Sequence, residues 1–400
     1  MANDELEFEI LRASNEAVDD ESAQGSGLPP NEVAELARTL TDEADYVRWL
    51  KTQKSDRNFR DMFNVGALVE QTRPVSAKAN NLVTQSFNEL GHYEEARRRA
   101  MLLRGALSGE TGMPNPENAL EWQEAVGHSA RAFKQSYVDQ RVANPDQAVP
   151  PDTAALLQEA ISLYSLLLEY DGLRSVWGGV NVAACMVRAE KDGISSGSEI
   201  DIETVCSKVI SCVETRKTRV AELAHTPDND ELIALKNEEV WDIASEAEAL
   251  LGLKRYKDAR EKYVELIQFQ TAAWKAHKAD EPDAEFEDFA LASAFRQLRE
   301  VWGLSATHPD PDAAQLYNHF HMLIARLPNS ETDFTIEDVK GLSDSDFESG
   351  DAFISESQAM FEAIHDNIQP VGASDWSVSF TNAMRAIAMV GSDNFISPSG

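Results

Sequence analysis

This chain of 400 residues is short of basic side chains, of cysteines and of long apolar runs. Its 36 lysines and arginines stand against 69 aspartates and glutamates, which gives a formal net charge of −33. A surface of that sign repels nucleic-acid phosphates and anionic lipids, so we expect neither duplex nucleic acid nor a membrane as the main partner. We expect a protein partner whose surface is basic or apolar, and no cofactor.

The same shortages bear on location. Cys185, Cys206 and Cys212 have neither CxxC spacing nor the density of a disulfide framework, which is typical of a reducing compartment. No apolar run approaches the roughly 18 residues of a membrane-spanning helix. The N-terminus lacks the basic-then-apolar pattern of a secretory signal. These features predict a cytoplasmic protein.

The chain does have clear helical periodicity, above all over residues 241–267. Apolar side chains recur at helical spacing on both sides of a break at residues 253–255. The pattern resembles a tetratricopeptide repeat, in which a small residue lies where two helices cross and aromatic residues flank it. Here Ala259 is the small residue, Tyr256 stands at the turn, and Tyr263 lies one turn beyond the alanine.

A second hairpin with the same turn is predicted over residues 77–107. One helical hairpin cannot bury its apolar side alone, so hairpins of this kind stack on one another. We therefore predict an all-α fold, an α-solenoid of tetratricopeptide-like hairpins. The aligned positions are Tyr93 with Tyr256, Ala96 with Ala259, Leu103 with Leu266, and Ala100 in place of Tyr263.

Composition divides the chain into four predicted segments. The first, residues 1–30, is an acidic tail that is either solvated or docks through its few apolar residues. Capping helices follow over 31–75 and the helical repeats over 76–328. Residues 329–400 form either a small α+β cap, with strands at 333–339 and 376–380 and a helix at 355–364, or an irregular capping helix pair.

The other expected helices carry less of the repeat pattern. Asn31 and Asp152 are the expected N-terminal caps of two of them. The predicted helices run over about residues 31–51, 117–142, 152–170, 176–189, 202–223, 283–302 and 312–327.

Three stretches in order point to a narrower family. They are residues 170–184 (YDGLRSVWGGVNVAA), the hairpin at 241–267, and residues 292–299 (ASAFRQLR). Together they resemble the TRAFs-binding region of the apoptosis-signal-regulating kinases and its bacterial relatives. The resemblance spans about residues 77–327 and implies an α-helical regulatory scaffold that binds other proteins.

Several residues hint at chemistry, and each has a simpler structural explanation. Residues 193–197 match the G-x-S-x-G pattern around Ser195, but a helix precedes the motif where a nucleophile elbow needs a strand. His319 and His321 point away from each other on one helix, so they do not face a common metal. Cys206 and Cys212 are expected to be small packing residues. The acidic loop at 344–351 lacks the glycine and glutamate of an EF-hand.

Two helical features remain. Asn181 lies among apolar residues after Gly178 and Gly179, and we expect it to bond to the backbone of an adjacent helix, with a ligand as the alternative. Arg296 and Arg299 lie on one helix face, where they could clamp a carboxylate; Glu300 can pair with Arg296 along the helix, so pairing within the chain is the simpler explanation.

We expect a non-enzymatic scaffold in a signalling or defence assembly. The alternatives are a hydrolase with its site near Ser195 and a small-ligand sensor that uses the concave face of the solenoid. The first helix of each hairpin is expected to line that face. The polar side chains predicted to reach outward to the partner are Gln85, Asn88, Glu89, Asp242, Glu246 and Glu248.

Overall fold

The computed structural model describes residues 27–109, 111–143, 147–170, 175–198, 200–226, 229–280 and 289–325. These residues form thirteen α-helices and one 3-10 helix, with a single β-bridge between Ser108 and Pro114 and no strand among them. The predicted all-α class is confirmed for this part of the chain. The predicted acidic tail up to residue 26 and the elements predicted beyond residue 328 lie outside it.

Contacts between helices divide the chain into two compact units, which we describe separately. In the described part, unit 1 ends at His128 and unit 2 begins at Ser129. The domain boundaries expected from composition, at residues 30, 75 and 328, stay predictions.

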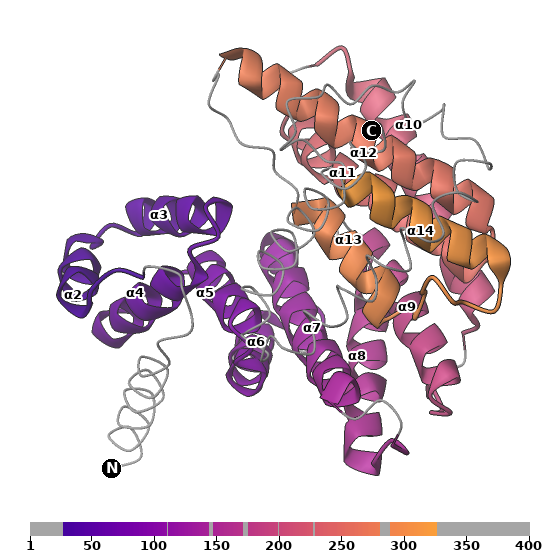
Figure 1. Ribbon diagram of the computed structural model, residues 1–400. Coiled ribbons are helices and arrows are strands. Elements are labelled where there is room, and N and C mark those ends of the chain that lie inside the picture. Colours follow the sequence, from indigo (N-terminus) through magenta and orange to yellow (C-terminus); the bar gives the residue numbers. More distant parts are fainter. Residues whose placement is uncertain are drawn as a thin grey trace, which may run out of the picture. The chain divides into compact units, whose positions relative to one another are not determined.

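Unit 1 contains five complete helices, a 3-10 turn and the first part of α7 (Figure 1). In this unit α4 packs against α2 and α5, α5 packs against α6, and α3 lies against α4 and α5. The elements are α2 (Pro30–Thr39), α3 (Glu43–Ser55), α4 (Phe59–Thr72), α5 (Ala77–Glu89), α6 (Tyr93–Leu107), η1 (Pro116–Asn118) and α7 (Ala119–Ala143).

The single helix predicted over residues 31–51 is wrong, because the chain breaks it into α2 and α3. The side chain of Asp42 accepts hydrogen bonds from the amides of Ala44 and Asp45 and so begins a new helix. Asn31 is not a cap either. Pro29 occupies the capping position and Pro30 the first turn, where the missing N–H of proline costs nothing.

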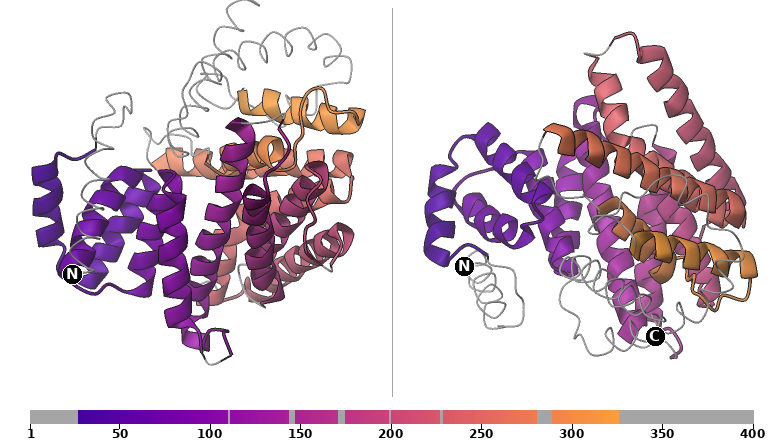
Figure 2. Two further views of the ribbon diagram at one scale, coloured as in Figure 1. Left: turned by 90° about the horizontal axis from the view of Figure 1, so that it is seen from below. Right: turned by 45° about the horizontal axis from the view of Figure 1, so that its top comes forward.

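Unit 2 contains the rest of α7 and seven further helices (Figure 2). Successive helices pack in series from α8 to α12, α9 also packs against α11, and α14 packs against α12 and α13. The elements are α8 (Pro151–Glu169), α9 (Ser175–Lys191), α10 (Ile202–Leu223), α11 (Asp230–Gly252), α12 (Tyr256–Asp280), α13 (Phe289–Glu300) and α14 (Pro311–Ala325).

The predicted bounds of α10 are confirmed, whereas the predicted cap of α8 is wrong. Pro150 takes the capping position of α8 without a side-chain hydrogen bond, and Asp152 lies inside the first turn. There its carboxylate suits the positive end of the helix dipole, which explains why the residue looked like a cap.

Two glycines set the spacing of the helices at the centre of unit 2. A Cβ atom on Gly178 would lie 2.5 Å from Cβ of Leu167 on α8, and one on Gly179 would lie 2.5 Å from Cγ2 of Val209 on α10. Any larger residue would therefore force α9 away from both neighbours.

Candidate functional site

The acidic side chains predicted to reach outward from α11 lie against its neighbours. Asp242 and Glu248 are each 5% exposed, and Glu246 is half-buried. Nη1 of Arg216 lies 2.5 Å from Oδ1 of Asp242, and Nζ of Lys217 lies 2.7 Å from Oε2 of Glu246. The expected outward orientation is wrong because α10 and α12 cover both sides of α11.

The α5 positions are covered as well. Gln85 is 8% exposed, Asn88 1% and Glu89 2%. Nδ2 of Asn88 donates to the backbone oxygen of His128 on α7, 3.1 Å away. The outward orientation expected for these three residues is also wrong, because α5 lies among other helices of its unit on most of its circumference. Contact of any of the six residues with a partner stays a prediction.

One of the α11 residues belongs to a buried chain of polar groups in unit 2, which we call the Lys134 network. Nζ of Lys134 donates to Oδ1 of Asn181 at 2.6 Å and to Oε1 of Gln297 at 2.9 Å. Nε2 of Gln297 and Nε1 of Trp302 then donate to Oε2 of Glu248, at 2.6 and 2.8 Å. The network joins α7, α9, α11 and α13 with Trp302, the second residue after α13.

Burial governs the ionisation of both ends of this network. It raises the pKa of Glu248 to about 7 and lowers the pKa of Lys134 to about 8. Each group partly offsets the cost of burying the other, and the amide of Gln297 bridges them. The network therefore fixes the register of four helices.

The prediction for Asn181 was right about its burial and wrong about its partner. Its Nδ2 donates to the backbone oxygen of Trp177 in its own helix, 2.9 Å away, and its Oδ1 accepts a hydrogen bond from Nζ of Lys134. Sequence reasoning missed Lys134, because one lysine in an amphipathic helix normally reads as a surface residue. The available signal was its setting beside Ala130, Ala132 and Phe133.

The residues predicted to shape the repeats differ in how deeply they are buried. Ala96 and Ala259 are fully buried, as is Ala100, and Tyr263 is 1% exposed. The turn residues Tyr93 and Tyr256 are half-buried.

The other candidate residues are placed as follows. Ser195 is exposed in the loop between α9 and α10, with no strand before it, and its backbone oxygen accepts from Nε2 of Gln158. Cys206 is buried and Cys212 half-buried, both as free thiols. His319 is buried. The side chain of His321 and the acidic loop lie outside the described part of the chain. Within that part, no three metal-binding side chains come together.

The expected pairing around Glu300 is confirmed. Nε of Arg296 lies 3.8 Å and Nη2 of Arg299 3.1 Å from its carboxylate oxygens.

One end of the α10–α12 array carries apolar side chains outside the core, and we call this end the distal tip (residues 214–226, 229–241 and 268–279). In α10 the last buried residue is Val213 and in α12 it is Ile267, whereas α11 still buries Leu232 and Leu235 within the tip. Beyond them Ile233 is 48% exposed. Figure 2 shows α10 and α11 extending together away from the other helices of their unit. Other apolar residues of the tip, all half-buried, are Val220, Leu223, Trp241, Phe269 and Trp274.

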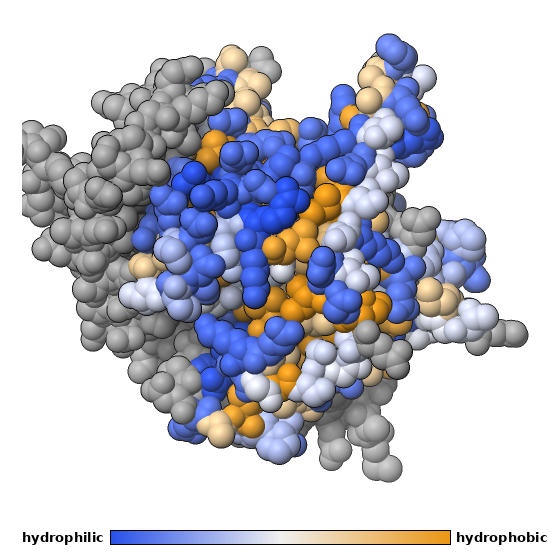
Figure 3. All heavy atoms as spheres, turned by 90° about the vertical axis from the view of Figure 1, so that its right-hand side faces the viewer, coloured by the Kyte–Doolittle hydropathy of each residue, from blue (hydrophilic) through white to orange (hydrophobic). Residues whose placement is uncertain are grey.

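The register of α11 and α12 brings two of these side chains to the same level. Glu246 on α11 lies 3.3 Å from Lys262 on α12, which fixes the antiparallel alignment. Ile233 and Trp274 lie nearly the same distance along their helices from that ion pair. Figure 3 shows apolar surface running between hydrophilic residues on one face of the molecule. The tip can therefore offer an apolar contact to another molecule.

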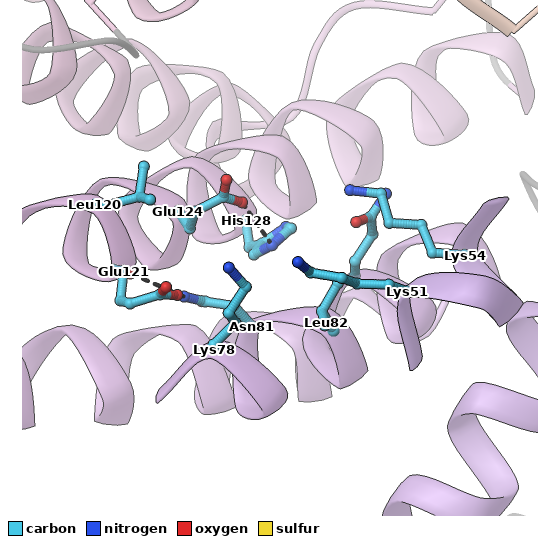
Figure 4. Close-up of a pocket in the computed structure, with 10 residues that line it drawn as sticks. Lys51, Lys54, Lys78, Asn81, Leu82, Leu120, Glu121, Glu124 and His128 are labelled. Atoms are coloured by element: carbon cyan, nitrogen blue, oxygen red, sulfur yellow. Dashed lines mark hydrogen bonds and ion pairs between the residues drawn. The ribbon is translucent and has the colours of Figure 1, made fainter. Parts of the chain in front are cut away.

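Unit 1 holds a pocket of about 160 Å³ lined by α3, α5 and α7. Lysine side chains enter it from α3 and α5, and Glu121 and Glu124 line it from α7 (Figure 4). Buried polar groups of α5, among them Asn81 and Gln85, complete the wall.

Comparison with known proteins identifies neither the distal tip nor the pocket in unit 1. No protein-family model matches the chain, and no curated protein matches it either. Among the described helices, none has the length and apolar character needed to cross a membrane.

Proposed function

We propose that this chain is a non-enzymatic regulatory scaffold, an α-solenoid of tetratricopeptide-like hairpins that binds a protein partner in a signalling or defence assembly. The observation that carries the proposal is the distal tip, where Ile233 and its half-buried neighbours stay outside the core. Aromatic residues are enriched in the cores of protein–protein contacts, and the tip contributes Trp241, Phe269 and Trp274.

The Lys134 network supports kinship with the TRAFs-binding region. The three stretches that carry the resemblance lie far apart in the sequence, yet each supplies one member of the network. Asn181 comes from the first, Glu248 from the hairpin and Gln297 from the last. Because all three stretches contribute to the Lys134 network, their packing against one another would explain why the three occur together in one chain.

The charge of the tip favours an apolar partner surface over a basic one. The residues of the tip carry 6 acidic and 6 basic side chains, a net charge of 0 against −33 for the chain. Ion pairs such as the one between Arg219 and Glu231, at 2.8 Å, use up part of this charge. Association through the tip should therefore depend little on salt.

Site-specific photo-crosslinking tests the proposal. A photoreactive residue replaces Ile233 in cells that naturally contain the chain, and a matched one replaces Glu203, which is exposed at the opposite end of the same array. We expect one discrete protein adduct from position 233 and none from 203. Trp274→Ala should abolish the adduct without lowering the melting temperature. Equal adducts at both positions, or no adduct at either, would contradict the proposal that the partner binds at the distal tip.

The rival hydrolase has its own test. If Ser195 is a nucleophile, Ser195→Ala removes a measurable hydrolytic activity while the protein stays folded. We expect no such loss, because no strand lifts the hydroxyl over a sheet at this exposed loop.

A further inference from the structure

The pocket in unit 1 concentrates positive charge in a strongly acidic protein. The first 128 residues contain three lysines, Lys51, Lys54 and Lys78, and all three line this pocket. Within the described ranges, Lys51 and Lys78 have no hydrogen-bond or ion-pair partner. Figure 4 shows their ammonium groups turned toward the same space. Two unpaired cations that converge on one hollow form a seat for an anionic group.

A buried acceptor in the same pocket also lacks a partner. Asn81 is 3% exposed, and its Nδ2 donates to the backbone oxygen and to Oε2 of Glu121, at 2.9 and 3.0 Å. Those bonds fix the orientation of the amide. Its Oδ1 is left buried with no hydrogen-bond donor among the described residues. These bonds hold Asn81 rigidly in the wall of the pocket, next to the carboxylate of Glu121.

The signs of the charges narrow the class of ligand. Two carboxylates, Glu121 and Glu124, line the α7 side next to that orphaned oxygen. A doubly charged phosphate would be drawn to the lysines and repelled by both glutamates. A carboxylate with an adjacent ammonium group satisfies both sides, since its carboxylate can approach the lysines while its ammonium group approaches the glutamates. Leu82 and Leu120 add apolar wall for a side chain.

We propose that this pocket binds a free α-amino acid with an aliphatic side chain. Lys51 and Lys78 hold its carboxylate, and Glu121 and Glu124 hold its ammonium group. Its volume of about 160 Å³ is close to that of an engineered protein cavity of about 150 Å³ that binds benzene, so a small ligand fits. The site lies in unit 1 and is independent of the partner seat proposed for the distal tip.

Thermal unfolding of the full chain with L-leucine, L-isoleucine, L-valine and L-alanine tests the proposal. At about a hundredfold excess over its dissociation constant, a bound amino acid should raise the melting temperature by several degrees. Two leucine analogues each lack one charged group, namely 4-methylpentanoate and 3-methylbutylamine. Neither should raise the melting temperature, and neither should inorganic phosphate.

Variants locate the effect. Lys51→Met with Lys78→Met should abolish the shift, and both side chains sit at the surface of the pocket, so the fold should survive. Arg48→Met is the matched control, because it removes one positive charge from a highly exposed position of α3 outside the pocket. It should leave the shift unchanged.

Four outcomes would overturn the proposal. These are no shift with any of the amino acids, a shift with phosphate as large as with an amino acid, an equal shift with either analogue, or a shift that persists in the double lysine variant. Because none of them involves the distal tip, they leave the scaffold proposal untouched.

Discussion

The α5–α6 hairpin of unit 1 and the α11–α12 hairpin of unit 2 turn in the same way with different residues. In each, a leucine ends the first helix, and the next residue has a positive φ, +79° at Gly91 and +56° at Lys254. The hydrogen bonds across the turn also correspond. His92 N bonds to Phe87 O and Arg255 N to Leu250 O; Ala96 N bonds to His92 O and Ala259 N to Arg255 O.

The two hairpins differ in the polar residue of the first helix that faces the interior. Five residues before the leucine, unit 1 has Gln85 and unit 2 has Glu248. Gln85 lines an open pocket, whereas Glu248 lies in the closed Lys134 network. The two hairpins thus share a backbone turn and differ in this inward residue, which lies in the Lys134 network in unit 2 and lines the pocket proposed as a ligand site in unit 1.

The largest expected effect tests whether the two helices of each hairpin cross equally closely at their alanine. Ala259→Arg places a long charged side chain where the alanine is fully buried, so both overpacking and charge burial oppose folding. We expect a loss of more than about 4 kcal/mol in the free energy of unfolding, measured by urea denaturation. Ala96→Arg should cost a similar amount, and exposed Glu261→Arg almost nothing. A small effect at Ala259 would break the correspondence.

The second effect concerns the one aligned position at which the two hairpins have side chains of different size. Tyr263 is 1% exposed and stacks on Phe320 with ring centroids 4.4 Å apart, whereas unit 1 has Ala100 at this position. Tyr263→Ala should cost about 3–4 kcal/mol, because it leaves a cavity. Tyr256→Ala, at a half-buried position, should cost clearly less in the same urea titration. Equal losses would mean that Tyr263 is not a core residue.

Much of the fold could be predicted from the sequence, because helices of this kind show their apolar period and their turns directly. Both hairpins and the exact span of α10 were predicted. The break after α2 was not, since the apolar stripe runs on through Asp42, whose capping role depends on local backbone geometry. The two caps predicted at Asn31 and Asp152 failed because a proline preceded each helix and took the position.

The sites were harder to predict for a physical reason. A polar residue on the first helix of a hairpin reads as surface until the neighbouring helices are known, so Asp242 and Glu248 were assigned outward. Lys134 meets Gln297, 163 positions further along the chain, and no local pattern reports such a contact. The lysine pocket likewise combines three helices whose mutual placement the sequence does not reveal.

The third effect exchanges the inward residue of one hairpin for that of the other. Burial holds the pKa of Glu248 at about 7, above its usual 4.5, so the folded state keeps a proton that the unfolded state releases between these values. Its contribution to stability is therefore present below about pH 4.5 and lost as the pH rises toward 7. Lys134 stays charged in both states over this range, because its lowered pKa of about 8 lies above it.

Glu248→Gln removes that loss and keeps an oxygen that can accept from Gln297 and Trp302. Relative to the variant, the wild type should lose roughly 1–3 kcal/mol of unfolding free energy between pH 4.5 and 7. Parallel urea titrations across this range measure the difference. Parallel curves for the two proteins would show that Glu248 does not titrate in the folded state.

The smallest effect concerns the turn itself, where the two hairpins use different residues for one conformation. Gly91 at φ +79° has open space where a Cβ would lie, so Gly91→Ala tests backbone strain alone and should cost about 1 kcal/mol. Lys254 at φ +56° already bears that strain, and Lys254→Gly should stabilise by about 0.5 kcal/mol, less than the strain because glycine loses more entropy on folding. Melting temperatures of the two variants should move in opposite directions. If both fall, the positive φ at Lys254 is supported by side-chain contacts that its counterpart in unit 1 does not need.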